Sequence, residues 1–313
     1  MLRIRNLSVY FQTIKGTFAA VNNFDLDLKQ GEIVSIVGES GSGKSVCMLA
    51  LMGLLSKNSI IKYDEISFEG KNILQLKDSQ RRSYLGAKMS MIFQEPISSL
   101  NPCFRVGDQV AEVFRFHQGD SKKAAQDKTI DLFTQVGIAD AKHRYRDYPH
   151  QLSGGMNQRV MIAMAIALKP KVLIADEPTT ALDVTIQAQI LNLLNDIRDK
   201  YNMALILITH DMGVVAMMAD RVVTLYRGQQ VEISDKEQLF SNPKHPYTVD
   251  LLASLPEEAK GKRLNSITGV IPPLHEIFTG CIYAPRCKFA VPECQKPIKM
   301  KSAGKNHLYR CIR

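Results

Sequence analysis

GESGSGKS, at residues 38–45, is the stretch that decides the fold. It fits the spacing G-x-x-x-x-G-K-[ST], directly after the apolar run GEIVSIVG (31–38) and directly before the helical pattern SVCMLALMGLL (45–55). The glycines let the backbone wrap a polyphosphate with its amides pointing inward, and the N-terminus of the following helix adds positive potential. The stretch therefore predicts a phosphate-binding loop, and the alternative is an ordinary glycine-rich turn.

Each side chain of this loop has an expected role. Lys44 would reach the β- and γ-phosphates of a nucleotide such as ATP, and Ser45 would bind Mg²⁺. The remaining loop residues that we expect to contact nucleotide are Gly38, Ser40, Gly41, Ser42 and Gly43.

A second apolar run, KVLIADE (171–177), ends in two acids. Asp176 can hold Mg²⁺ through water, and Glu177 is placed one residue further on to polarise an attacking water. An acidic pair after a strand is by itself usually a solvated loop. Beside a phosphate-binding loop, the pair indicates ATP hydrolysis, with Glu177 as the catalytic base.

Two further apolar runs, MSMIFQ (89–94) and MALILITHD (203–211), also end in polar residues. Runs that are apolar on both faces suit buried strands of a parallel sheet, and helical patterns such as IQAQILNLLNDIRDK (186–200) alternate with them. We therefore expect an α/β sheet with ligands at the carboxyl ends of its strands. Gln94 and His210 would reach that edge and position the γ-phosphate, its Mg²⁺ or the attacking water.

Length and composition set outer bounds. The 313 residues, 45% hydrophobic, suffice for about two domains without disulfides. No apolar run reaches the roughly 18–20 residues that cross a bilayer, and MLRIRNLSVYF lacks the core of a signal peptide. We expect a cytosolic protein with reduced thiols. The net charge of +9 suits nucleic acid, an anionic membrane face or a polyanionic ligand, and equally a solvated basic surface.

The pattern changes twice along the chain. Between Glu95 and Gln158 it turns mostly helical, as a helical insert in the α/β core would. After Phe240, eight prolines, from Pro243 to Pro297, predict a separate appendage with little regular structure. The expected domains are residues 1–240, with a helical subdomain at about 95–158, and a C-terminal extension at 241–313.

LSGGMNQ (152–158) separates this chain from other P-loop ATPases because it resembles the signature of ATP-binding cassette (ABC) proteins. TTALD (179–183) and THD (209–211) complete the family's set of motifs in the family's order. The resemblance implies a P-loop NTPase (RecA-like) ABC cassette. Such a cassette has an N-terminal antiparallel β subdomain and a helical subdomain insert, and here a small irregular C-terminal extension follows it.

The signature itself predicts a second anion site. Ser153 and the amides of Gly154 and Gly155 stand at a helix N-terminus, which suits a γ-phosphate. The resemblance implies that this phosphate lies in the loop of an opposite subunit, so that two cassettes clasp two ATPs and Asp183 crosses the interface. It also implies that an aromatic before the loop stacks on adenine; Phe11 is expected, with Tyr10 and Phe18 as alternatives.

Longer stretches narrow the resemblance to the dipeptide/oligopeptide importer family, with dipeptide importers closest: IFQEPISSLNPCFRVGDQ, the region from SGGMNQ to TIQAQIL, and NPKHPYTVDLLASLP. The resemblance implies a peripheral protein on the cytoplasmic face of the bacterial inner membrane. Its implied partners are two membrane permeases, a related second ATPase subunit or a second copy of this chain, and indirectly an extracytoplasmic peptide-binding protein. Segment 97–102 would lie near the groove that receives a permease.

Four cysteines gather near the end of the chain: Cys281, Cys287, Cys294 and Cys311. Four thiolates could hold Zn²⁺ or an iron–sulfur cluster. From Cys281 onward, eight Lys and Arg accompany one acid, Glu293, which suits the negative charge of either centre. The family resemblance implies a [4Fe–4S] cluster; zinc and free packed thiols stay as alternatives. Cys47 and Cys103 are expected to be packing residues.

Two other classes of function are alternatives to an importer ATPase. A nucleic-acid-associated cassette ATPase is compatible with the positive charge, but the chain has no aromatic–basic stacking pattern, so no nucleic-acid partner is expected. An inactive nucleotide-binding module is disfavoured because Glu177 and His210 are both present. The sequence does not identify the cargo, which could also be heme, nickel or antimicrobial peptides.

Overall fold

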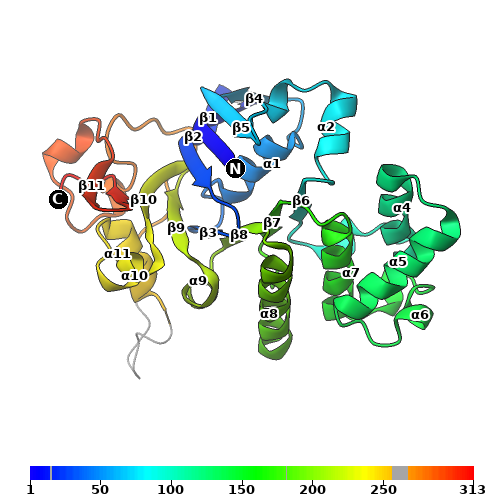
Figure 1. Ribbon diagram of the computed structural model, residues 1–313. Coiled ribbons are helices and arrows are strands. Elements are labelled where there is room, and N and C mark those ends of the chain that lie inside the picture. The colour runs from blue at the N-terminus through cyan, green and yellow to red at the C-terminus, as the bar shows by residue number, and fades with distance from the viewer. Residues whose placement is uncertain (15, 181, 256–266) are drawn as a thin grey trace. The chain divides into compact units, whose positions relative to one another are not determined.

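The computed structural model describes residues 1–14, 16–180, 182–255 and 267–313. These residues form two compact units (Figure 1), and each is described by itself. The first unit comprises Met1–Lys29, Ile33–Gln75 and Ile208–Arg313, and the second comprises Gln30–Glu32 and Leu76–Leu207. Within the described ranges, no helix is long and apolar enough to pass through a lipid bilayer.

The first unit contains an antiparallel sheet built around β1 (Leu2–Thr13). Its partners are β2 (Gly16–Leu28), β4 (Ser59–Lys62) and β5 (Glu65–Phe68), and all three pairings are antiparallel. Leu2 and Ile4 are buried before an irregularity at Asn6, which has φ +52°, and Leu7 and Val9 are buried after it. The irregularity shifts the alternation by one residue, so that both pairs of apolar side chains are buried. The antiparallel β region expected at the N-terminus is present.

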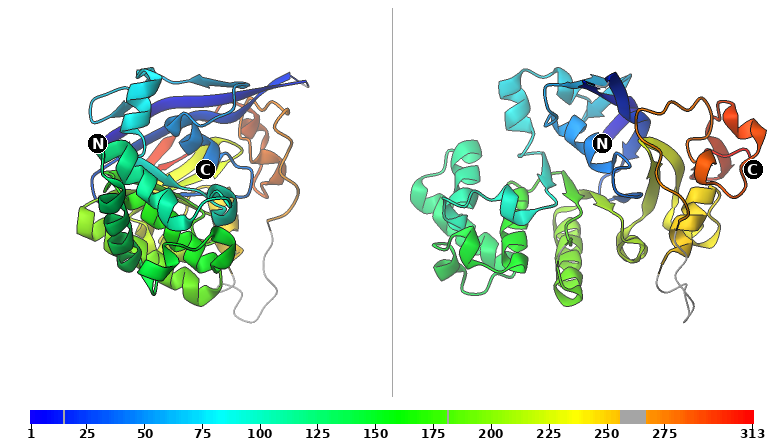
Figure 2. Two further views of the ribbon diagram at one scale, coloured as in Figure 1. Left: turned by 90° about the vertical axis from the view of Figure 1, so that its right-hand side faces the viewer. Right: turned by 180° about the vertical axis from the view of Figure 1, so that it is seen from behind.

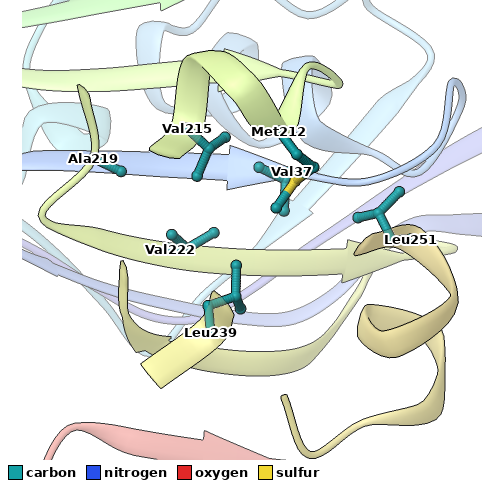
Figure 3. Packing of buried hydrophobic residues seen from close by; sticks show 7 residues of the cluster. All are labelled: Val37, Met212, Val215, Ala219, Val222, Leu239 and Leu251. Atoms are coloured by element: carbon teal, nitrogen blue, oxygen red, sulfur yellow. The ribbon is translucent and has the colours of Figure 1, made fainter. Parts of the chain in front are cut away.

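The same unit holds the strand that leads to the phosphate-binding loop. This strand, β3 (Ile33–Val37), is buried along its whole length and pairs in parallel with β9 (Arg221–Tyr226), which pairs antiparallel with β10 (Gln229–Asp235). Figure 3 shows Val37, at the end of β3, packed among side chains of β9 and the helices α9 (Met212–Met218), α10 (Lys236–Ser241) and α11 (Pro246–Ala253). This apolar cluster fixes the point from which the loop departs.

The C-terminal extension contains more regular structure than the prolines led us to expect. Its elements are α11, the 3₁₀ turns η4 (Ala284–Arg286) and η5 (Pro292–Gln295), and the strands β11 (Lys301–Gly304) and β12 (His307–Tyr309). Pro246 begins α11, where a missing N–H costs nothing. In addition, β12 pairs antiparallel with β10 and extends its sheet. Figures 1 and 2 show these segments, orange to red, beside α11.

A buried carboxylate ties this extension to β10. Glu232 accepts hydrogen bonds from the backbone N–H groups of Lys244 (2.7 Å) and His245 (2.9 Å). Its Oε1 also lies 2.7 Å from His307 Nε2 on β12, and both side chains are almost wholly buried. A buried charge is tolerated only when it is paired in this way. The extension is therefore packed as an integral part of the first unit.

The second unit contains the strands β6 (Met89–Ile92) and β7 (Val172–Asp176), which are parallel neighbours and buried along their lengths. Next to β7 runs β8 (Ala204–Thr209), where Ala204 N–H donates to the Lys171 carbonyl. The helix between them, α8 (Val184–Tyr201), turns Ile190, Leu191, Leu194 and Ile197 inward. The apolar runs that predicted buried strands are thus strands, and the pattern at 186–200 is a helix.

Helices make up the rest of the second unit, and Figure 2 shows the green ones gathered together. They are α2 (Asp78–Tyr84), α3 (Pro96–Ser99), α4 (Val106–Gln118), α5 (Lys122–Gln135), α6 (Ala141–Arg144) and α7 (Gly154–Ile166), with the 3₁₀ turn η2 (Pro149–Gln151). α4, α5 and α7 pack against one another. The expectation that Cys103 packs in this region was wrong, because its side chain is exposed. Cys47, on α1 (Lys44–Met52) of the first unit, is buried as expected.

Candidate functional site

The phosphate-binding loop joins β3 to α1 in the first unit. Gly43, the residue before α1, has φ +95°, and a Cβ there would lie 2.6 Å from the Ala20 carbonyl oxygen. Gly38 has φ +150°, and its Cβ would lie 2.2 Å from the Leu225 carbonyl oxygen. Only glycine satisfies both the backbone conformation and the close approach. The loop is also clamped from the β9–β10 turn, where Gly228 N–H donates to the Ser42 carbonyl over 2.7 Å.

Lys44 and Ser42 are both buried in this loop. Lys44 Nζ donates to the carbonyls of Gly38 (2.8 Å) and Glu39 (3.0 Å), so the ammonium lies inside the turn of backbone. Among the described residues, Ser42 Oγ is a buried hydroxyl with no hydrogen-bond partner. A buried hydroxyl without a partner, in the same loop as a buried ammonium and just before a helix, fits a phosphate group. Ser45 is the second residue of α1, and Ser40 and Gly41 are exposed at the rim.

The aromatic residues considered for adenine lie on the hairpin of β1 and β2. Phe11 and Phe18 are cross-strand partners with ring centroids 6.4 Å apart. All three candidates are half-buried, and Tyr10 lies beneath the ammonium of Lys62, which is 5.6 Å from the ring centroid. The hairpin therefore offers Phe11 and Phe18 together as one aromatic surface.

Glu177 and Gln94 are brought together in the second unit. Gln94 Nε2 donates to Glu177 Oε2 over 3.0 Å, and Thr180 Oγ1 donates to the same oxygen over 2.9 Å. Asp176, the last residue of β7, is buried, and the chain turns sharply after it because Glu177 has φ +45°. Sequence reasoning assigned no role to Thr180, although it lies in the TTALD stretch. These contacts orient the Glu177 carboxylate.

The signature residues begin α7. Ser153 is the N-cap, and its Oγ accepts a hydrogen bond from Met156 N–H at 3.3 Å. Gly154 and Gly155 form the first helical positions, and a Cβ on Gly155 would lie 2.9 Å from Ile186 Cγ2 on α8. Asp183 caps α8 by accepting from Ile186 N–H at 2.9 Å. The capped N-termini of α7 and α8 therefore meet at Ile186. Ala181, within the TTALD stretch, lies outside the described residues.

His210 is exposed in the first unit, between β8 and α9. The next residue, Asp211, caps α9 by accepting hydrogen bonds from Gly213 N–H (2.8 Å) and Val214 N–H (3.3 Å). This cap fixes the turn on which His210 stands.

A groove of about 810 Å³ in the second unit follows α3 and runs along α4. Phe104 and Phe116, which line it, are 57% and 71% exposed. Exposed aromatics beside a groove are typical of a surface that binds another protein. Ser99 and Asn101, from the segment expected near a permease, also line it; the Ile97 side chain lies outside the described atoms.

The four C-terminal cysteines line one small cavity in the first unit. Its volume is about 10 Å³, and His245 and Tyr283 share its wall with Cys281, Cys287, Cys294 and Cys311. All four are free thiols, and burial raises the pKa of Cys281 to about 11. Nowhere in the described part of the chain do three His, Cys, Asp or Glu side chains converge closely enough to hold a single metal ion. We call this cavity the thiol pocket.

A wrapped glycine loop before a helix, with a buried lysine inside it, defines a P-loop nucleotide-binding protein. Comparison with known proteins identifies the family to which this P-loop protein belongs. A family model described as ABC transporter matches residues 21–180, and one described as Oligopeptide/dipeptide transporter, C-terminal region, matches residues 231–294.

Individual proteins agree with these matches. The chain is 50% identical over 296 residues to the dipeptide transport ATP-binding protein DppD of Escherichia coli K12, covering 94% of this chain and 90% of that protein. It is 44% identical over 312 residues to the oligopeptide transport ATP-binding protein OppD of Haemophilus influenzae, covering 99% and 96%. A dimeric structure of the ATP-binding cassette MJ0796 bound to ADP and Pi matches with TM-score 0.68 and 26% identity, covering 75% of this chain and 99% of that chain.

The chain therefore belongs to the ABC transporter family, and it is an ATPase of the cassette type that uses ATP and Mg²⁺. The expected cassette fold is confirmed, and so is the resemblance to the dipeptide/oligopeptide importer family.

Proposed function

We propose that this protein is the ATP-hydrolysing subunit that powers import of dipeptides or short peptides across a membrane. The observation that carries the proposal is the family-specific C-terminal region at residues 231–294, together with 50% identity to a dipeptide transport ATP-binding protein. ABC cassettes for many kinds of cargo share the same nucleotide site. The C-terminal extension is therefore the feature that points to peptides as the cargo. We propose that it forms a separate functional region, 241–313, beside the ATPase region, 1–240.

The ATPase roles proposed for residues of each unit are those that the family resemblance implies. Lys44 and Ser42 are placed to bind phosphate, and Ser45, Gln94 and Asp176 are the residues that would hold Mg²⁺, which supplies charge neutralisation at the phosphates. Glu177 takes a proton from the attacking water, because Gln94 and Thr180 hold its carboxylate in one orientation. His210 contacts the γ-phosphate, and Phe11 stacks on adenine.

A second cassette completes the site. Ser153, Gly154 and Gly155 present a helix N-terminus suited to the γ-phosphate held by an opposite subunit, and Asp183 lies at the contact with that subunit. The cassette MJ0796, whose fold this chain shares, has a dimeric structure with ADP and Pi. The second cassette is a related ATPase subunit or another copy of this chain.

The membrane partners are two permeases, and one of them docks in the groove beside α3 and α4 of this chain. Exposed Phe104 and Phe116 supply the apolar contact that such a partner would cover. The protein would then lie at the cytoplasmic face of the bacterial inner membrane, and a peptide-binding protein outside would deliver cargo to the permeases. No nucleic-acid partner is proposed.

The thiol pocket is proposed to hold a [4Fe–4S] cluster, with Zn²⁺ as the lesser possibility. Four cysteines around one cavity supply the usual ligand set. The family resemblance is what favours a cluster over a single ion here. The cavity of about 10 Å³ must widen by rotation of the thiols, and the group would then stabilise a segment with short strands and turns.

Anaerobic purification of the full chain tests this site. About four irons and four sulfides per chain, with broad visible absorption, are expected. Cys287→Ser should abolish the absorption, and Cys103→Ser, which changes an exposed thiol outside the pocket, should keep it. A colourless anaerobic preparation that contains one zinc per chain would contradict the iron–sulfur cluster and show that the thiol pocket binds zinc.

Purification of the tagged chain from membranes in detergent tests the transport function. Two permeases and a second ATPase subunit should co-purify, and the reconstituted complex should take up labelled dipeptide in an ATP-dependent way. Salt-sensitive co-purification with DNA or RNA, without permeases, would instead support a nucleic-acid-associated ATPase.

A further inference from the structure

Arg286 of the C-terminal extension forms an ion pair with the phosphate-binding loop. Its Nη1 lies 2.7 Å from Glu39 Oε2, and its Nη2 lies 3.1 Å from Glu39 Oε1. The two residues are 247 positions apart in the sequence. A two-point guanidinium–carboxylate pair fixes orientation as well as distance. The Arg286 side chain is 4% exposed and that of Glu39 is 24% exposed, so solvent screens the pair only partly.

Two further donors of the guanidinium have partners. Nε donates to the Thr268 carbonyl over 2.9 Å, and Nη1 is 3.4 Å from the Tyr226 hydroxyl. The hydrogen bond to Glu39 is the main reason that the pKa of Arg286 is raised above its usual value. Arg286 is therefore a fixed cation rather than a mobile surface side chain.

Glu39 is held by its backbone as well. Its N–H donates to the Tyr247 hydroxyl over 2.8 Å, and its carbonyl accepts from Lys44 Nζ over 3.0 Å. Glu39, the ion-pair partner of Arg286, is thus in direct contact with Lys44, the lysine assigned to phosphate binding. A displacement of Glu39 would move a carbonyl that positions the Lys44 ammonium.

Three buried tyrosines connect the ion pair between Arg286 and Glu39 to the thiol pocket. Tyr226, Tyr247 and Tyr283 have ring centroids 4.7 to 5.3 Å apart, and none is exposed. Cys281 and Cys287 of the thiol pocket pack against this cluster, and Cys287 directly follows Arg286. Packed side chains of this kind transmit a displacement because the interior has little free space.

We propose that Arg286 is a positioning residue of the nucleotide site, and that through Arg286 and the three tyrosines the state of the thiol pocket sets the affinity of the P-loop for ATP. Arg286 neutralises the Glu39 carboxylate beside the polyphosphate and holds the Glu39 backbone against Lys44. When the thiols take up or lose a bound group, turn η4 shifts, and the charge balance beside the phosphates changes. The ion-pair part stands on the contacts alone, and the thiol part rests on the proposed cluster site.

A suppressor experiment on the full-length chain tests the ion pair through the dissociation constant of MgATP. Arg286→Gln leaves the Glu39 carboxylate uncompensated beside the polyphosphate, and it should weaken binding by about tenfold, as expected for loss of a partly buried charged contact. Adding Glu39→Gln in the same chain removes that repulsion and should restore most of the affinity. The control is Lys288→Gln, two positions after Arg286 in the sequence. It breaks the exposed ion pair between Lys288 and Asp250 and should leave the affinity for MgATP unchanged.

A merely structural role gives a different result. If Arg286 only stabilises the extension, Arg286→Gln lowers the melting temperature and leaves MgATP affinity unchanged, or the double variant binds ATP worse than either single variant. Either outcome overturns the proposal for Arg286.

The thiol arm uses Cys287→Ser in two backgrounds. It should change MgATP affinity in the native background, and it should have no further effect in the Glu39→Gln, Arg286→Gln chain. Unchanged affinity in the native background would overturn the coupling to the thiol pocket. Iron content is measured on the same samples. A change of affinity in a chain that never held metal would refute the cluster and with it the thiol part, whereas the suppressor experiment would still decide the role of the ion pair.

Discussion

The side-chain amide of Gln94 donates a hydrogen bond to Glu177 Oε2 over 3.0 Å. The two residues follow β6 and β7, which are parallel neighbours, so both chains leave the sheet at the same edge. Thr180 donates to the same oxygen. The carboxylate that we assign as the base is therefore oriented by hydrogen bonds from Gln94 and Thr180.

Glu177→Gln should keep MgATP binding and lose turnover by roughly 10²- to 10⁴-fold, the usual contribution of a general base. The amide preserves the shape of the side chain but does not take a proton. Steady-state hydrolysis and nucleotide binding on the same preparation check this. Hydrolysis at the native rate would remove Glu177 from the base role.

Thr180→Val should lower kcat roughly threefold to tenfold with little change in KM, because a hydrogen bond of this kind contributes about 1 kcal/mol. Thr179→Val is the matched control, since no side-chain contact joins Thr179 to Glu177 among the described hydrogen bonds. Its turnover should stay near the native value. Equal losses in both variants would show that Thr180 acts through the fold of the loop.

Gly43→Ala should abolish tight ATP binding. Its φ of +95° already costs a side chain about 1–3 kcal/mol, and the added Cβ would lie 2.6 Å from the Ala20 carbonyl oxygen. Gly41→Ala meets open space at φ +75° and should carry only the backbone strain. Nucleotide titration of both variants compares them, and a Gly43→Ala chain that binds ATP as well as Gly41→Ala would contradict the geometry of the loop.

His307→Ala should lower the free energy of unfolding by about 1–3 kcal/mol, because it removes one of three partners from the buried Glu232 carboxylate. Lys305→Ala, which shortens an exposed side chain on the same hairpin, should cost little. Urea denaturation measures both. If the two variants unfold alike, the Glu232 contact does not anchor the extension.

Much of the nucleotide site could be predicted from the sequence because each part is local. The loop, the acids after β7 and the cap at Ser153 are short segments whose conformation depends on neighbouring residues. That Gln94 would meet Glu177 followed less directly, since it depends on β6 and β7 being adjacent, and no local pattern specifies strand order.

The extension was predicted less well. Its prolines indicated broken structure, yet Pro246 stands at the one helical position that favours it. The pairing of three-residue β12 with β10 joins distant segments and leaves no periodic signal. The ion pair between Arg286 and Glu39 is likewise invisible in sequence, because any of the eight basic residues after Cys281 could have served.

The central claim is that the ATP site is complete only when a second cassette supplies its Ser153 helix start. Turnover per chain, measured against chain concentration with the molecular mass recorded in the same samples, tests it most directly. We predict that turnover rises as pairs form, or when the related subunit is added, and that it is negligible for the single chain. Full-rate hydrolysis by a chain that stays strictly monomeric would contradict the account.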